Sequence, residues 1–196
     1  MSRYNAEISA GSLLVAESRK LAGLLLGSPT PDQWDAAIKQ DNILQRTPAT
    51  ARRMARLIRN RLETLDAEGL ELVSTGDAEL CVQMLMAAAI RHSRLLGDFM
   101  RDVYAQDLRQ LERHLSHRQW DAFLADCEQQ DAAVASWAAT TRLKLFQVIV
   151  RILAEAKYLD SSKTMGLTPP LLHPRVRSYL FLLGDLETLQ RMDYHQ

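Results

Sequence analysis

The sequence predicts an all-α protein, and three observations lead to this class. Apolar residues recur at three- and four-residue spacing along nearly the whole chain. Leu, Ala, Arg and Gln, all of which favour helices, are the dominant residues, and alternating strand-like runs are scarce. Hydrophobic residues make up 47% of the 196 positions, enough to bury a sizeable interior. We therefore expect a compact multi-helix bundle, either one all-helical domain over 1–196 or two small domains that share a core.

The end of the first helix and the start of the second are marked by residues that favour helix termini. A helix over 12–26 should end where Gly27 suits a C-terminal cap, two residues before a proline. The next helix begins with a capping-box signature, in which Thr30 is the N-cap, Pro31 is the first helical position and Gln33 reaches back. This helix covers 31–44, and its expected interior residues are Trp34, Ala37, Ile38 and Leu44.

A third helix is expected over 48–65, with Thr47 as a possible N-cap before Pro48. At 100° per residue its apolar face consists of Met54, Leu57, Ile58, Leu62 and Leu65. Its opposite face carries three arginines within about 60° of one another: Arg52, Arg56 and Arg59. Arg53 flanks this stripe. Arg61 projects from the apolar face, where a guanidinium needs a carboxylate or carbonyl partner, so a structural role is expected for it.

Later helices are expected over residues 77–93, 95–115, 117–129, 137–158, 174–182 and 185–192. The connection at 160–173 is the only long irregular stretch, and a small strand pair or wing is one alternative there. The tetrapeptide QWDA occurs at 33–36 and again at 119–122, and the runs ATARR and ATTRL follow each copy. This similarity raises the hypothesis of a duplicated helix-turn-helix, at 31–65 and at 117–158.

Positive charge is concentrated in one place. The chain has 24 Lys plus Arg and 24 Asp plus Glu, yet residues 46–62 hold six arginines and no acid. The helices at 31–65 are joined by a short turn, which is typical of a helix-turn-helix whose second helix enters the DNA major groove. The predicted contacts to double-stranded DNA are Arg46, Thr47, Thr50, Arg52, Arg53, Arg56 and Arg59.

Two other interpretations of this stretch stay open. Most basic stripes are solvated faces whose charges pair with acids one helical turn away, but here only Arg59 has such an acid, Glu63. The stripe could instead dock an acidic protein surface. We prefer nucleic acid, because the charge is locally unneutralised.

The helix at 137–158 is apolar nearly all round. Its narrow polar strip consists of Thr140, Lys144, Gln147, Arg151 and Glu155. The residues at its start that could make secondary DNA contacts are Thr140, Thr141, Arg142 and Lys144, although the sequence favours packing as the main role of this helix. Lys163, Arg175 and Arg177 are weaker supporting candidates.

Neither catalysis nor cofactor binding is indicated. His114 and His117 lack a third ligand at suitable spacing, and Asp98 and Asp102 lie near Arg94 and Arg101, which favours ion pairing over a metal site. No phosphate-binding glycine loop or nucleophile motif occurs. Cys81 and Cys127 show no paired spacing, which fits a reducing cytoplasm.

No membrane segment is predicted either. The longest uncharged runs have eleven residues, short of the ~20 that a spanning helix requires. The start of the chain carries Glu7 and Glu17 among its apolar residues and lacks a cleavage pattern, so a cytoplasmic protein is expected.

Three stretches carry a family resemblance: YNAEISAGSLLVAESR (4–19), DNILQRTPATARRMARLIRNRL (41–62) and LLGDFM (95–100). They resemble the BrxA family, small core proteins of bacterial BREX bacteriophage-exclusion systems. The resemblance implies an all-helical, non-enzymatic, DNA-binding protein. It also implies that other BREX components, such as the methyltransferase, are partners and supply the chemistry. A weaker, fold-level resemblance to NusB-like antitermination proteins would imply RNA binding.

Overall fold

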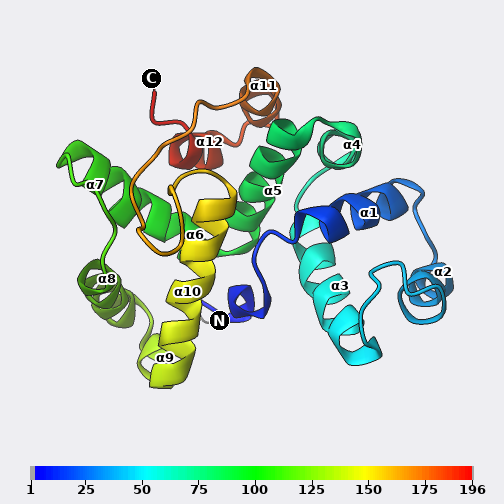
Figure 1. Ribbon diagram of the computed structural model, residues 1–196, viewed down its shortest axis with the longest axis horizontal. Helices are drawn as coiled ribbons and strands as arrows, with labels where there is room; N and C mark the ends of the chain where they lie inside the picture. The colour runs from blue at the N-terminus through cyan, green and yellow to red at the C-terminus, as the bar shows by residue number, and fades with distance from the viewer. Residues whose placement is uncertain (1–2, 196) are drawn as a thin grey trace. The chain divides into compact units, whose positions relative to one another are not determined.

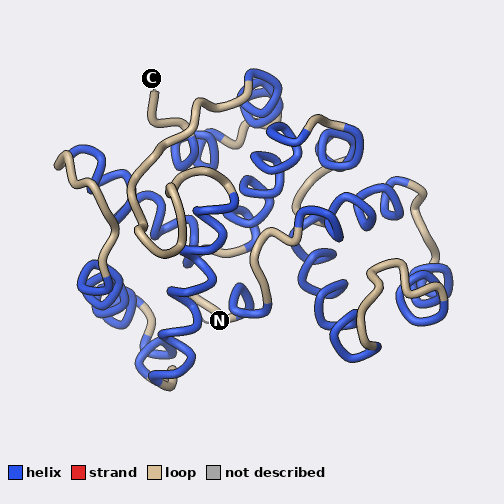
Figure 2. The backbone as a smooth tube through the Cα atoms, in the orientation of Figure 1, coloured by secondary structure: helices blue, strands red, loops and turns tan. Residues whose placement is uncertain are grey.

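The computed structural model describes residues 3–195, and its regular structure is helical (Figure 1). Figure 2 shows helices joined by loops, and the only strand-like pairing among the described residues is two isolated bridges. The predicted all-α class is confirmed. The chain divides into two units, an N-terminal unit of Leu13–His92 and a C-terminal unit of residues 3–12 and 93–195. The single domain over 1–196 stays a prediction, and each unit is described by itself.

The N-terminal unit packs α1 against three later helices. Its elements are α1 (Val15–Leu26), α2 (Pro31–Asp35), the π-helical turn η2 (Ala36–Gln40), α3 (Pro48–Leu62), α4 (Ala67–Thr75) and α5 (Ala78–His92). Contacts join α1 to α3, α4 and α5, and join α3 to η2 and α5. The predicted interior residues Trp34, Ala37, Ile38 and Leu44 are all buried. The periodicity therefore identified the inner face of this segment correctly.

Helix boundaries in this unit differ from the predicted ones for local reasons. The first helix begins at Val15 because Leu14 adopts a left-handed conformation with φ 53°. The second helix has only five α-helical residues before its hydrogen bonds widen to the π pattern of η2. The predicted third helix continues to Leu65, but α3 ends at Leu62, and α4 was not predicted at all.

The capping box of α2 is formed as predicted. The Thr30 hydroxyl accepts a hydrogen bond from Gln33 N at 3.2 Å, and Thr30 N donates to Gln33 Oε1 at 2.8 Å. Thr47 occupies the N-cap position of α3 but does not cap it. Its hydroxyl instead donates to the hydroxyl of Thr50 at 3.0 Å.

The C-terminal unit holds the short helix η1 (Glu7–Ala10) and most of the later helices. They are α6 (Arg94–Phe99), the π-helical turn η3 (Met100–Tyr104), α7 (Ala105–Arg109), α8 (His117–Gln130), α9 (Ala132–Ala135), α10 (Ala139–Glu155), α11 (Pro174–Leu182) and α12 (Leu186–Met192). α10 packs on η1, and α8 packs on η3. Phe99, Trp120 and Phe123 form an aromatic cluster with ring centroids 5.4–5.8 Å apart.

The predicted helix over 95–115 is too long. It ends at Arg109, and the following residues 113–115 run beside residues 165–167. Leu115 N donates to the Met165 carbonyl at 3.0 Å, and Leu167 N donates to the Arg113 carbonyl at 2.9 Å. The strand pair considered for 160–173 is thus reduced to isolated bridges, because only a few backbone groups on each side find partners.

A buried carboxylate, Asp98, ties the C-terminal unit together. Its side chain is fully buried, and the ion pair with Arg101 predicted from the sequence is present at 2.9 Å. The Tyr4 hydroxyl donates to it at 2.8 Å, and Arg191 Nη2 lies 3.1 Å away. Burial by itself raises the pKa of Asp98, but the Tyr4 hydroxyl and Arg101 outweigh burial and hold that pKa below its usual value. One carboxylate therefore links the N-terminal segment, α6 and α12.

Within residues 3–195, no helix is both long and apolar enough to cross a membrane.

Candidate nucleic-acid interface

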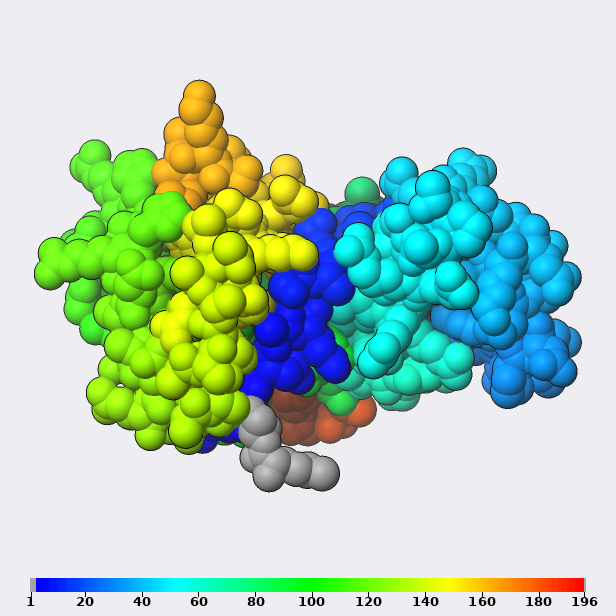
Figure 3. Space-filling view, turned by 90° about the horizontal axis from the view of Figure 1, so that it is seen from below, coloured from blue at the N-terminus to red at the C-terminus, as the bar shows by residue number. Residues whose placement is uncertain are grey.

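The outward face of α3 is cationic, and its inward face is apolar. Met54, Leu57, Ile58 and Leu62 are 0–7% exposed, whereas Arg52, Arg53 and Arg56 are exposed. The predicted orientation of the helix is confirmed. In the part of the chain that the structure describes, no acidic side chain pairs with these three arginines. In Figure 3, atoms of this region, coloured cyan, lie open on the face shown.

Arg59, the third arginine of the predicted stripe, is held within its own unit. Its Nε lies 2.6 Å from Glu63 Oε1, the partner expected from the sequence. Its guanidinium also lies 4.7 Å from the ring centroid of Trp34, a cation–π distance. Because both contacts fix Arg59 beside α2, it is less available to a phosphate than Arg52 or Arg56.

At the start of α3, a partly paired arginine, Arg46, lies near backbone amides that have no acceptor within the helix. Arg46 Nη2 lies 3.0 Å from Glu17 Oε1 on α1, so its charge is partly neutralised. The amides of Ala49 and Thr50 in the first turn have no intrahelical acceptor, and no side chain caps them; Pro48 has no amide hydrogen. Such a helix start, with the hydroxyls of Thr47 and Thr50 beside it, suits a phosphate oxygen.

A groove of about 370 Å³ runs between α2, η2 and α3. One wall carries Arg52, Arg56 and Asn60, and the other carries Trp34 and Lys39. Lys39 pairs with Asp35 one turn earlier, so the uncompensated charge of the groove comes from α3. Sequence reasoning did not identify Lys39 or Asn60, because the groove depends on how η2 approaches α3.

Arg61 lies on the buried side of α3, as predicted, and is only 4% exposed. It therefore belongs to the packing of the N-terminal unit and not to the exposed arginine face.

The predicted secondary contacts in the C-terminal unit are divided by their environment. Arg142 is engaged internally, with Nη1 2.5 Å from Glu128 Oε1 and Nε donating to the Trp137 carbonyl at 3.0 Å. Thr140 and Lys144 are exposed, and Thr141 is half-buried. Of this set, only Lys144 presents an available positive charge.

These observations define an all-helical protein whose helix α3 presents three exposed arginines without an acidic partner among the described residues. A family model named BrxA matches residues 2–182. The BREX protein BrxA of Paramagnetospirillum magneticum is 42% identical over 91% of this chain and 90% of its own length. The BREX protein BrxA of Escherichia coli is 31% identical over 95% of this chain and 88% of its own length. The chain belongs to the BrxA family.

A solved structure supports the same fold. The crystal structure of an uncharacterized protein from Magnetospirillum magneticum is similar, with a TM-score of 0.91 at 38% sequence identity. The match covers 97% of this chain and 98% of that chain.

Proposed function

We propose that this chain is a non-enzymatic, double-stranded-DNA-binding protein of a BREX phage-defence system, acting in the cytoplasm. The observation that carries the proposal is the exposed face of α3, where Arg52, Arg53 and Arg56 have no acidic partner among the described residues. The family supplies the biological setting, because its relatives are BREX proteins. Other BREX components, including the methyltransferase, are the proposed partners.

The physical chemistry of α3 suits duplex DNA. Guanidinium groups bind phosphate oxygens through paired, charge-assisted hydrogen bonds, and each such contact releases a counterion. Arg52 and Arg56 lie one helical turn apart on the same face of α3, and Arg53 lies beside them. This spacing suits contacts with neighbouring phosphates. The uncapped start of α3 supplies further donors to a phosphate. Affinity from these contacts depends on salt and only weakly on base sequence.

The test is a fluorescence-anisotropy titration of a labelled duplex with the purified protein at several salt concentrations. The expected dissociation constant is ~10⁻⁴ to 10⁻⁶ M near physiological salt, with affinity falling steeply as salt rises. Duplex RNA in a parallel titration separates DNA binding from RNA binding. Absence of any signal at roughly 50 µM protein in low salt, where phosphate contacts are strongest, would refute the proposal and favour an acidic protein partner.

A further inference from the structure

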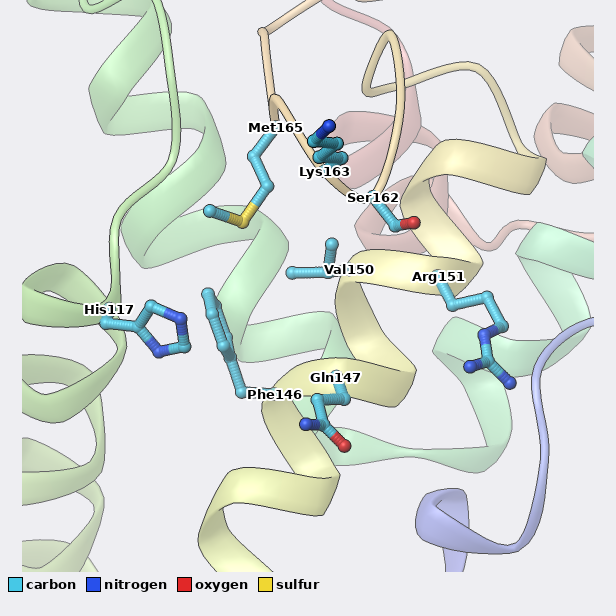
Figure 4. A pocket seen from close by; sticks show the side chains of 8 residues that line it. All are labelled: His117, Phe146, Gln147, Val150, Arg151, Ser162, Lys163 and Met165. Carbon is cyan, nitrogen blue, oxygen red and sulfur yellow. The ribbon is translucent and has the colours of Figure 1, made fainter.

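Two groups of polar side chains in the C-terminal unit lie outside the α3 surface. One lines a pocket of about 430 Å³ between α10, the first residue of α8 and the loop at 162–165 (Figure 4). Figure 4 shows the two cations of its lining, Lys163 and Arg151, directed to different sides, so the pocket does not bring two charges together. The other group surrounds the buried carboxylate of Asp98, where positive charges converge.

Four guanidinium groups, here called the arginine cluster, meet at the Asp98 carboxylate. Its Oδ1 lies 2.9 Å from Arg101 Nη1 and 3.1 Å from Arg191 Nη2. Its Oδ2 lies 3.2 Å from Arg3 Nη2 and 3.6 Å from Arg94 Nε. The four arginines come from the N-terminal segment, α6, η3 and α12, which all belong to the C-terminal unit. The fold thus gathers cations from distant parts of the sequence around one carboxylate.

The acidic side chains near the arginine cluster are fewer than its arginines. Two of the arginines each have a second acid at 2.6 Å, and these acids are Asp102 and Glu187. With Asp98, three negative charges face four positive ones. For Arg3 and Arg94, no acid other than Asp98 lies within ion-pair distance among the described residues. The uncompensated charge therefore lies with Arg3 and Arg94.

The carboxylate oxygen that Arg3 and Arg94 share has a third donor. The Tyr4 hydroxyl donates to Oδ2 at 2.8 Å, a shorter contact than either arginine makes with this oxygen. The 3.6 Å contact of Arg94 is beyond normal hydrogen-bond length. The buried Nε of Arg191 likewise has no hydrogen-bond acceptor among the described residues. The arginine cluster is therefore short of acceptor atoms as well as of negative charge.

Arg3 and Arg94 are open to a ligand from solvent. Their side chains are 34% and 53% exposed, whereas the carboxylate that they share is fully buried. An anion can therefore meet the two guanidinium groups without displacing Asp98. The cluster is also held in place from below, because Gly97 leaves room for Arg191: a Cβ at Gly97 would lie 3.0 Å from Arg191 Nη1. Groups that are already ordered lose less entropy when a ligand binds.

We propose that Arg3 and Arg94 bind a phosphate group at the surface of the arginine cluster. Guanidinium groups bind both carboxylates and phosphates, but a phosphate presents more acceptor oxygens, which suits a cluster with an excess of donors. The phosphate of a small molecule and the phosphodiester of a nucleic-acid strand share this chemistry. The inference does not depend on DNA binding by α3.

The experiment is isothermal titration of the full-length protein with pyrophosphate at constant ionic strength. Arg3→Ala and Arg94→Ala should each weaken pyrophosphate binding about tenfold, because each removes charge-assisted hydrogen bonds. The matched control is Arg151→Ala, which removes an exposed arginine of the same unit outside the cluster and should bind pyrophosphate like the wild type. The variant Arg52→Ala/Arg53→Ala/Arg56→Ala should also bind it like the wild type, which separates this inference from the proposed DNA surface.

Two further probes complete the test. Succinate, a dicarboxylate, should bind at least about tenfold more weakly than pyrophosphate. A thymidine hexamer without terminal phosphates assigns the source of the phosphate: competition with pyrophosphate that is lost in Arg94→Ala indicates a nucleic-acid strand, and no competition indicates small phosphorylated molecules. Melting curves without ligand check that both cluster variants are folded. No pyrophosphate binding, equal binding by the wild type and both cluster variants, or equal binding of succinate would overturn the inference.

Discussion

The helix pairs α2–α3 and α8–α10 begin alike and diverge in how they use arginine. The tetrapeptide QWDA begins within both first helices, and both helices start in a capping box, formed by Thr30 with Gln33 in α2 and by Ser116 with Gln119 in α8. The related runs ATARR and ATTRL lie at the starts of α3 and α10. The shared signature therefore specifies a helix start, but it does not specify what the second helix does.

The difference appears at one pair of equivalent positions. Arg52 in ATARR is exposed without an acidic partner among the described residues, whereas Arg142 in ATTRL pairs with Glu128. Arg142 also donates to the carbonyls of Trp137 and Val134. A carboxylate from the end of α8 thus converts a surface arginine into a structural one. An arginine is available to a phosphate only if the fold places too few acidic side chains close enough to neutralise its charge.

The same contrast extends to other arginines of the two units. In the C-terminal unit, Arg101 and Arg191 converge on Asp98, and Arg177 pairs with Asp193 at 2.5 Å. In the N-terminal unit, the exposed arginines of α3 have no such acid among the described residues. Carboxylates of the C-terminal unit thus hold Arg101, Arg177 and Arg191, whereas no described carboxylate reaches Arg52, Arg53 or Arg56.

The largest expected effect concerns the carboxylate that joins segments. Asp98→Ala leaves several arginines around a buried site without their anion, so it should lower the free energy of unfolding by about 3 to 5 kcal/mol. Because the folded pKa of Asp98 is lowered, its contribution is present above the ordinary carboxyl range and is lost as pH falls through the folded pKa. Thermal melting followed by circular dichroism at neutral and acidic pH measures both. An Asp98→Ala melting curve that matches the wild type would contradict the structural role of these arginines.

Arg142→Ala tests the structural arginine of the comparison directly. It removes an ion pair and the hydrogen bonds to the carbonyls of Val134 in α9 and of Trp137, so the expected loss of stability is about 2 kcal/mol. The salt dependence of DNA binding should not change. If the log–log salt slope instead fell by about 0.9, Arg142 would be a phosphate contact and the comparison would fail.

A buried acid distinguishes the two capping boxes. Gln119 Nε2 donates to Asp107 Oδ1 at 2.7 Å, and burial, with a smaller contribution from Glu112, raises the pKa of Asp107 to about 6. The folded state thus binds more protons than the unfolded state, and Asp107 lowers stability as pH rises from the ordinary carboxyl range to about 6. Asp107→Asn keeps an acceptor for Gln119 without the charge. It should therefore stabilise the protein at pH 7 by about 1 to 2 kcal/mol.

Melting curves of Asp107→Asn and the wild type at about pH 4 and pH 7 measure this effect, since only the higher pH ionises the carboxyl group. The advantage of the variant should disappear at the lower pH. A variant that is less stable than the wild type at pH 7 would show that the carboxylate is needed in its ionised form.

The smallest expected effect concerns the N-cap residues Thr30 and Ser116. Thr30→Ala and Ser116→Ala each remove a side-chain acceptor from a helix start, at about 1 kcal/mol. Ser116→Ala should cost more, because Gln119 also fixes Asp107 and shifts when its capping partner is lost. Paired chemical denaturation curves provide the comparison. If Thr30→Ala lost more stability than Ser116→Ala, the hydrogen bond from Gln119 to Asp107 would add nothing to the stability of the α8 capping box.

Local signals made much of the fold predictable. The spacing of Met54, Ile58 and Leu62 indicated the buried face of α3, and the residues Thr30 and Gln33 indicated the start of α2. Both features depend on neighbours within one or two turns. Periodicity and capping chemistry capture interactions at this range.

Interactions between distant residues were not predictable in the same way. Glu17 pairs with Arg46 across 29 positions, and Trp34 meets Arg59 only because η2 packs on α3. Residues 113–115, which were predicted to continue the helix, instead pair through their backbone with residues 165–167. Because Arg46 and Arg59 have such partners, the predicted DNA-binding arginines that stay available are those without a contact to a distant residue.

The most direct test of the account measures the salt slope of duplex binding for two triple variants of equal charge. The first replaces Arg52, Arg53 and Arg56 of α3 by alanine. The control replaces three exposed arginines of the C-terminal unit by alanine: Arg109, Arg113 and Arg118. The α3 variant should reduce the slope of log K against log salt by about 2.7, since each lost phosphate contact removes ~0.9, and the control should leave the slope unchanged. An unchanged slope for the α3 variant, or an equal reduction for both, would contradict the claim that α3 is the DNA-binding surface.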